Sequence, residues 1–188
     1  SQPHKPLILM GDAYGFQKAH DDHIAARKTN ALVGNKEINR AIRKDRHTLF
    51  TIIASFPKKV SEVSASNELT DRLKLWVRKT CKWVRKKYGE QLKVALLHID
   101  EEYPHIHFWM LPSDPSGNAK LLHPGKRAKL EVEAQLKLEG TPSRTAVKLG
   151  NRAFKKEMRS WIDDYFLNVG LEFGFHRDGP GRRRLSAA

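Results

Sequence analysis

The sequence predicts an α+β domain built on a central antiparallel β-sheet, and three observations carry that expectation. Two apolar, β-like runs, Leu92 to Ile99 and His105 to Leu111, flank a short polar loop and are typical of an antiparallel hairpin. A third run, Thr48 to Phe56, is dense in β-formers and stops at a proline, which favours a central strand. An amphipathic pattern from Ser66 to Tyr88 predicts a long helix packed across one face of this sheet.

The N-terminal part of the chain predicts one further strand and two helices. Leu7 to Met10 is a short apolar run closed by a glycine, which indicates a strand. The mixed pattern from Ala13 to Ala31 favours a helix, with a loop at Gly34. Asn35 to Arg46 is interpreted as a second short helix because its apolar residues recur at helical spacing. Those residues are Ile38, Ala41 and Ile42.

Within the long helix, Trp76 and Trp83 fall on the apolar stripe, so we interpret them as core anchors and not as platforms for stacking nucleotides. Lysine and arginine are frequent on the other sides of this helix, as expected for a helix that faces solvent there. Gly89 is its expected end, since glycine adopts the left-handed conformation common at helix ends.

The C-terminal part predicts a turn at 113–117, followed by a charged region up to Gly140 that is partly helical. Thr141 to Lys148 is interpreted as a connection. Ala153 to Val169 predicts another amphipathic helix, ended by Gly170.

Composition favours a single domain that spans residues 1–188. Its last residues, 176–188, form a basic tail, and we expect folding back onto the domain and disorder equally. Apolar residues make up 39% of the chain, which suits a core of ordinary size and excludes that the chain as a whole is a disordered basic segment. No membrane span and no secretion signal are evident, so we expect a cytoplasmic protein. The single cysteine, Cys81, excludes thiolate metal clusters, and any bound metal must be held by histidine and carboxylate.

Charge favours an anionic partner, first of all nucleic acid. The chain has 35 Lys+Arg against 21 Asp+Glu, a formal net charge of +14. Each basic side chain that meets a phosphate releases condensed counterions. The basic residues cluster within 40–46, 78–87, 126–129 and 182–184, and these clusters could converge on a groove after folding. The residues expected to contact DNA are Arg27, Lys126, Arg127, Arg182, Arg183 and Arg184.

The residues that carry chemistry lie in and beside the predicted hairpin. His105 and His107 are two apart on one strand and therefore project to the same side, whereas Ile106 and Phe108 face the other. The hairpin can bring His98 of the preceding strand to the same point. Three imidazoles on rigid strands form a site for one divalent ion with positions left open for substrate, which is typical of a catalytic metal centre.

The run from His98 through Asp100, Glu101 and Pro104 to His105 and His107 resembles the metal motif of the HUH endonucleases, specifically the MobV (Mob/Pre) plasmid mobilisation relaxases. The resemblance implies a relaxase-type fold in which the three histidines bind Mn²⁺ or Mg²⁺, with Zn²⁺ also acceptable to imidazoles, and Glu101 assists. It also implies nicking of single-stranded DNA at an origin of transfer, which leaves a 5′-phospho-protein adduct and a free 3′-OH. Accessory relaxosome proteins are further expected partners.

Relaxases place the nucleophile ahead of the metal motif, where this chain offers Tyr14, His20 and His23. The resemblance favours His20, with Asn30 ten residues further on. Asp21 and His23 stand where the family has Asn and Arg, so Tyr14 and His23 remain alternatives. A neutral imidazole can attack phosphorus near neutral pH, whereas a tyrosine would need help to lose its proton.

Two other functions remain open from the sequence. The first is a rolling-circle replication initiator or HUH transposase, in which the nucleophile follows the metal motif. The second is a non-catalytic basic module that binds nucleic acid. Neither the origin sequence nor the physiological ion is encoded in these motifs.

Overall fold

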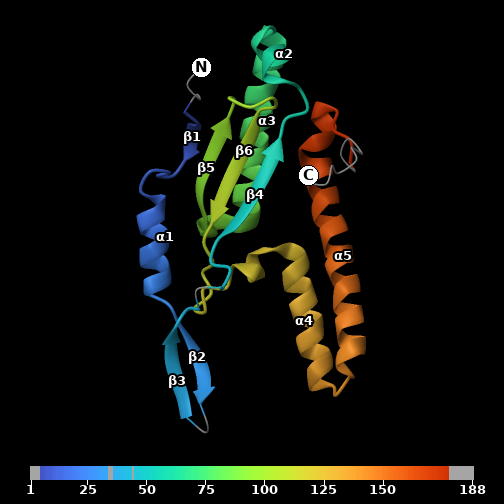
Figure 1. Cartoon of the computed structure of the whole chain (residues 1–188). Helices are drawn as coiled ribbons and strands as arrows, with labels where there is room; N and C mark the ends of the chain where they lie inside the picture. Colours follow the sequence, from blue (N-terminus) through green and yellow to red (C-terminus); the bar gives the residue numbers. More distant parts are fainter. Residues whose placement is uncertain (1–4, 34–35, 44, 178–188) are drawn as a thin grey trace, which may run out of the picture.

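The computed structural model describes residues 5–33, 36–43 and 45–177, and its strands and helices follow one another in mixed order along the chain (Figure 1). The strands are β1 (Leu7–Met10), β2 (Lys28–Val33), β3 (Lys36–Ala41), β4 (Phe50–Ser55), β5 (Leu92–His98) and β6 (His105–Met110). The helices are α1 (Phe16–Ala25), α2 (Val60–Ser64), α3 (Asn67–Tyr88), α4 (Pro124–Leu138) and α5 (Ser143–Asn168), with short 3-10 turns at Gly89–Gln91, Ala119–Leu122 and Gly170–Phe173. The predicted α+β class is confirmed.

The main sheet is antiparallel throughout and has the strand order β1-β5-β6-β4. The predicted hairpin of β5 and β6 therefore lies at its centre. The prediction that the Thr48 to Phe56 segment forms a central strand is wrong, because β4 takes the sheet edge. The outer edge of β5 pairs with β1, and the outer edge of β6 pairs with β4. The alternating burial along β4 agrees with a strand that has one face open.

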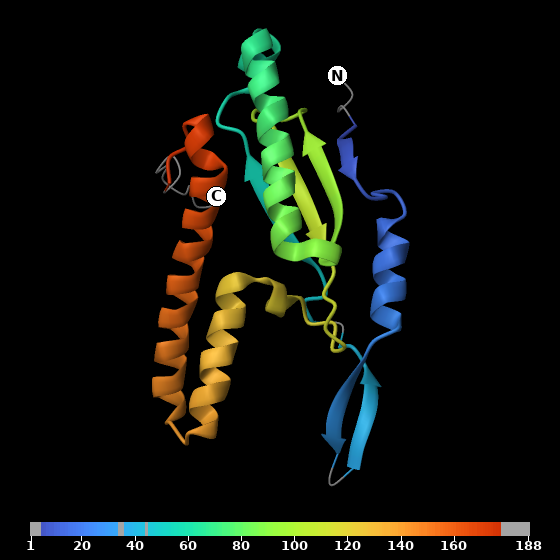
Figure 2. The same ribbon diagram turned by 180° about the vertical axis from the view of Figure 1, so that it is seen from behind.

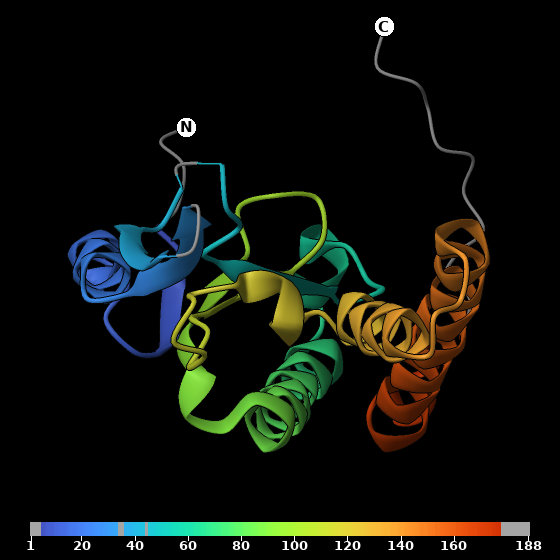
Figure 3. The ribbon, with the colours of Figure 1, turned by 90° about the horizontal axis from the view of Figure 1, so that it is seen from below.

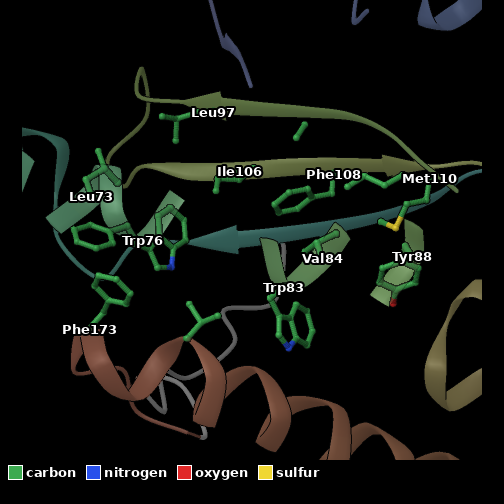
Figure 4. Packing of buried hydrophobic residues seen from close by; sticks show 14 of the residues in the cluster. Leu73, Trp76, Trp83, Val84, Tyr88, Leu97, Ile106, Phe108, Met110 and Phe173 are labelled. Atoms are coloured by element: carbon green, nitrogen blue, oxygen red, sulfur yellow. The ribbon is translucent and has the colours of Figure 1, made fainter. Parts of the chain in front are cut away.

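Helix α3 packs across one face of this sheet, as predicted (Figure 2). Ser66 caps its first turn by accepting a hydrogen bond from the backbone N–H of Leu69, and Gly89 ends it with a positive φ of 51°. Figure 4 shows Ile106, Phe108 and Met110 on the side of β6 that faces the core.

The two tryptophans of α3 are core anchors, which confirms their interpretation. Trp76 is fully buried and Trp83 nearly so. Each indole N–H is satisfied by α5, since Trp76 donates to the Tyr165 hydroxyl and Trp83 donates to the Asp164 carboxylate. Burying an indole N–H costs little free energy when it has a hydrogen-bond partner. These two bonds therefore hold the C-terminal half of α5 against α3.

The predicted helix at Asn35 to Arg46 is wrong. The described residues of this segment form β3, which pairs with β2 from Lys28↔Ala41 to Val33↔Lys36 in a two-stranded ribbon. The helix expected from Ala13 to Ala31 accordingly ends at Ala25. A short apolar pattern fits either period, and here pairing between the two segments stabilises the extended form. Gly34 and Asn35 lie outside the described residues.

The expected connection at Thr141 to Lys148 is also wrong, since α5 already begins at Ser143 and pairs with α4 along their length (Figure 3). The sequence signal is weak because small residues form the contact between the two helices. A Cβ added to Gly150 would lie 2.8 Å from Cγ of Glu133, so the helices approach more closely than larger side chains would allow. The helix predicted over Ala153 to Val169 forms the continuation of α5.

Within the described ranges, no helix is both long and apolar enough to cross a membrane. The arginines predicted to contact DNA at 182–184 lie outside those ranges.

Candidate metal centre

The three histidines of the motif gather on the side of the sheet opposite α3. His98 and His105 are directly paired across β5 and β6, and His107 follows two residues later on the same face. The ring centres are 5.0 Å apart for His98 and His105, 4.8 Å for His98 and His107, and 5.0 Å for His105 and His107. The predicted convergence of the three imidazoles is thus present in the structure.

These ring separations suit ligation of one ion. An ion about 2.1 Å from each imidazole nitrogen places neighbouring ring centres about 4.5 to 5.2 Å apart for ligand angles between 90° and 109°. The ring planes do not yet converge, because those of His98 and His105 lie 12° from parallel. Accordingly, no group of three or more His, Cys, Asp or Glu in the described part of the chain holds its donor atoms ready for an ion. Rotation of the imidazoles within the cluster would be needed.

The surroundings of His105 favour a metal ligand. Its Nδ1 lies 3.0 Å from the carbonyl oxygen of Tyr103, to which it donates, so Nε2 carries the free lone pair in the neutral ring. A ligating histidine commonly donates its other N–H in this way, which fixes the tautomer and the ring orientation. Glu101 Oε1 lies 3.8 Å from that Nε2. The donor chemistry of these residues therefore suits a divalent ion, with Glu101 beside it, but the present orientation of the rings does not, and ligation by them stays a prediction.

The loop between β5 and β6 is held in place by the segment that follows β4. The backbone N–H of Phe56 donates to the carbonyl of Pro104, and that of Val60 donates to the carbonyl of Glu102. Asp100 Oδ1 lies 3.6 Å from Nδ1 of His98. Acidic groups thus flank two of the three imidazoles from a loop whose backbone is tied down.

Burial lowers the pKa of His107, and the neighbouring rings of His98 and His105 lower it further, while Glu101 opposes them. The neutral imidazole is the form that binds a metal ion. The surroundings of His107 therefore favour its neutral imidazole, which is the form that ligation of a metal requires.

His107 lies in a cross-strand row that spans all four strands. Ile8 of β1 pairs with Leu96 of β5, Leu96 pairs with His107, and His107 pairs with Ile53 of β4. Ile8 and Ile53 are 43% and 59% exposed. Sequence reasoning missed both residues, because their place beside His107 depends on strand register and not on spacing along the chain. The row leaves apolar surface open on either side of the histidines.

Helix α1 covers the next part of the same sheet face. Phe16 packs on Trp109, the residue that follows His107 by two on β6, with ring centres 4.9 Å apart. The ring of His20 lies 6.3 Å from that of Phe16, and His20 Nε2 is 3.0 Å from the hydroxyl of Thr48. His20 therefore lies beside Phe16, the residue of α1 that packs on the histidine side of the sheet.

The other two nucleophile candidates, His23 and Tyr14, have different surroundings. His23 Nε2 donates to the carbonyl of Pro112 at 2.9 Å, which ties α1 to the segment after β6, and burial lowers its pKa. Tyr14 is 77% exposed in the loop before α1, where Asp12 accepts hydrogen bonds from the backbone N–H groups of Tyr14 and Gly15. Neither of them contacts the three histidines in the described structure.

The predicted DNA contacts inside the described ranges, Arg27, Lys126 and Arg127, lie on elements other than the two strands of the histidine cluster. Arg27 donates to the backbone carbonyls of His23 and Asp114, so its guanidinium also joins α1 to the turn after β6. Lys126 and Arg127 lie in the first turns of α4, where Arg127 Nε is 3.9 Å from Glu131. Contact of these residues with DNA remains a prediction.

A family model described as plasmid recombination enzyme (Mob/Pre) matches residues 13–158. The match covers more than half of the chain and includes α1, the three histidines and α4. The chain therefore belongs to the Mob/Pre family of plasmid recombination enzymes. No match was found among curated proteins, and none among solved structures.

Proposed function

We propose that this chain is a MobV-type relaxase, a metal-dependent nickase that cuts one strand at a plasmid origin of transfer and keeps its 5′-phosphate bound. The observation that carries the proposal is the convergence of His98, His105 and His107, with ring centres 4.8 to 5.0 Å apart, on an open sheet face. Family membership supplies plasmid DNA as the substrate.

The three histidines would hold one Mn²⁺ or Mg²⁺, which offsets the charge that develops on the scissile phosphate. Hydrogen bonding to the carbonyl of Tyr103 keeps His105 in the tautomer that presents Nε2. Ile8 and Ile53 flank His107 and offer apolar surface to the nucleotides on either side of the phosphate.

His20 is the nucleophile that the contacts favour. Asp21 Oδ1 lies 3.4 Å from Nδ1 of His20, which favours a proton on that nitrogen, and the hydroxyl of Thr48 can donate to the lone pair of Nε2. In the proposed step, Nε2 leaves Thr48 and attacks phosphorus, a P–N bond forms and the P–O3′ bond breaks. The leaving 3′ oxygen takes up a proton from water and becomes the free 3′-OH, the phosphorylated ring releases its Nδ1 proton to water, and the 5′-phosphate stays on the protein.

Cleavage of single-stranded origin oligonucleotides in the presence of Mn²⁺ tests the proposal. Wild-type protein should yield a nicked strand and a protein adduct, and chelation of the ion should abolish both. His98→Ala and His105→Ala should lower cleavage by a factor of about a hundred or more, because truncating one ligand weakens metal binding. The matched control is His47→Ala, which removes an exposed histidine outside the cluster.

Calorimetric titration with Mn²⁺ separates a loss of metal from a loss of folding, since the His105→Ala protein should remain folded but bind the ion weakly. Unchanged cleavage after His105→Ala would contradict the proposal. Strong, salt-dependent DNA binding without metal-stimulated cleavage of any cognate origin would instead favour the non-catalytic binding module.

A further inference from the structure

The exposed side of α5 carries a stripe of basic residues that belongs to no site described so far. Its six members, called the α5 stripe below, are Arg144, Lys148, Arg152, Lys155, Lys156 and Arg159, and all are exposed. At 3.6 residues per turn they fall within about 120° of the helix circumference and extend over about 22 Å of its length. The last four line one open hollow on the surface.

Packing on the opposite side of α5 holds the stripe toward solvent. Phe154 stacks on His123 with ring centres 5.5 Å apart, and Trp161 meets Trp83 at 5.0 Å. Gly150 fits closely against Glu133 of α4. Figure 3 shows the N-terminal part of α5 running alongside α4 at the outer side of the molecule. Rotation of α5 would break these contacts, and the orientation of the stripe is therefore fixed.

Within the described ranges, the positive charge of the stripe is offset in part only at Arg159, whose charge interacts with the Asp163 carboxylate. None of its six members forms an ion pair there. The acidic residue that shares the hollow, Asp163, is already bound to Arg177, whose hydrogen bond lowers the pKa of that carboxyl. The stripe thus presents net positive charge to an approaching partner.

The chemistry of the stripe selects phosphate backbone over bases. It contains lysine and arginine only, and Phe154 and Trp161, which lie within the same stretch of α5 or next to it, pack on the opposite side of the helix. A straight row of about 22 Å matches a rigid double helix, which carries about thirteen phosphate charges over that length. Contacts of this kind position DNA without reading its sequence.

We propose that the α5 stripe is a binding site for the backbone of double-stranded DNA, separate from the histidine cluster. Figure 1 shows the N-terminal half of α5 at the opposite end of the molecule from the tip of β5, where His98 lies. A duplex on the stripe leaves the histidine face free for a single strand. The site therefore holds the paired DNA beside the strand that is cut.

Salt-dependent binding of a labelled duplex of arbitrary sequence tests this site without any cleavage. The triple variant Arg152→Gln, Lys155→Gln, Arg159→Gln keeps good helix formers and removes three charges. The salt slope of log K should decrease by about 2.7, at about 0.9 for each phosphate that the variant no longer neutralises. The drop in affinity between about 50 and 200 mM salt should then shrink by a factor of about 40.

A matched control removes the same charge from another helix. Arg78, Lys82 and Arg85 lie on the exposed side of α3, and their replacement by glutamine should leave the salt slope within error of wild type. Equal decreases in both variants, or no decrease in the α5 variant, would overturn the proposal. Binding is measured without metal, so a failure of the proposed nicking activity would leave this result readable.

Discussion

Ile53 has a large apolar side chain in solvent next to a candidate metal ligand. It pairs with His107 across the edge of the sheet and is 59% exposed. Exposed isoleucine on an edge strand contributes little to the core, so its position favours contact with a substrate. Ile8 occupies the corresponding place on the other side of the row. The two residues are candidates for placing the nucleotides that flank the cut.

Replacement of Ile53 tests this role. Ile53→Glu places a carboxylate beside His107 and the bound phosphate, and the repulsion should raise KM for a single-stranded oligonucleotide about tenfold, equal to about 1.4 kcal/mol. The free energy of unfolding should change little because the side chain is largely exposed. Leu171→Glu is the control, since Leu171 is 60% exposed and lies on the turn after α5. An unchanged KM in Ile53→Glu would exclude a substrate contact at this residue.

At the scale of elements, α4 is anchored at its first turn by an unusual cap. Nδ1 of His123 accepts a hydrogen bond from the backbone N–H of Lys126 at 3.3 Å, and its ring packs between Phe50 and Phe154. Burial lowers the pKa of His123, and the charge of Lys126 lowers it further. Protonation of Nδ1 would remove the acceptor, so the cap requires the neutral ring.

The stability of the chain should therefore depend on the protonation of His123. Its pKa in the folded protein lies below the ordinary value of 6.5, so the unfolded chain binds the proton more tightly. The stabilisation is present above about pH 6.5 and is lost as the pH falls through the folded pKa. His123→Asn keeps an acceptor that does not titrate, and its free energy of unfolding should fall less between about pH 7.5 and 5.5 than that of wild type.

Urea denaturation at the two pH values measures this difference. His123→Ala removes the acceptor and should destabilise the protein by about 1 kcal/mol already at neutral pH. If wild type and His123→Asn show the same fall in stability on acidification, the cap does not titrate as inferred.

The elements also differ in how far the sequence predicts them. The β5–β6 hairpin and α3 have long, consistent patterns, and the alternation of His105 and His107 with Ile106 and Phe108 places these two histidines on one face directly. The β2–β3 ribbon escapes prediction because its apolar residues also fit a helix and only pairing between the two strands selects the extended form. The start of α5 escapes prediction because Gly150 and Ala146 serve close packing and weaken the amphipathic pattern.

At the scale of the whole molecule, the net charge of +14 is distributed over separate surfaces. The tip of β5, where His98 lies, and the N-terminal part of the α5 stripe lie at different ends, which suits DNA that is single-stranded at one place and paired at another. From sequence alone, the charge indicates an anionic partner and the motif indicates the candidate metal ligands. Neither the charge nor the motif predicts the α5 stripe or the cross-strand row that contains His107. The orientation of a helix and the register of strands depend on packing between segments that are distant in the sequence.

Mapping of the covalent adduct by peptide mass spectrometry tests the central claim most directly. Wild-type protein incubated with Mn²⁺ and a single-stranded origin oligonucleotide should carry the 5′-phosphate on the segment with Tyr14, His20 and His23, and we expect His20 itself. His105→Ala should give no adduct. An adduct on a residue after His107 would identify an initiator or transposase mechanism, and cleavage by wild type without any adduct would contradict transesterification by this chain.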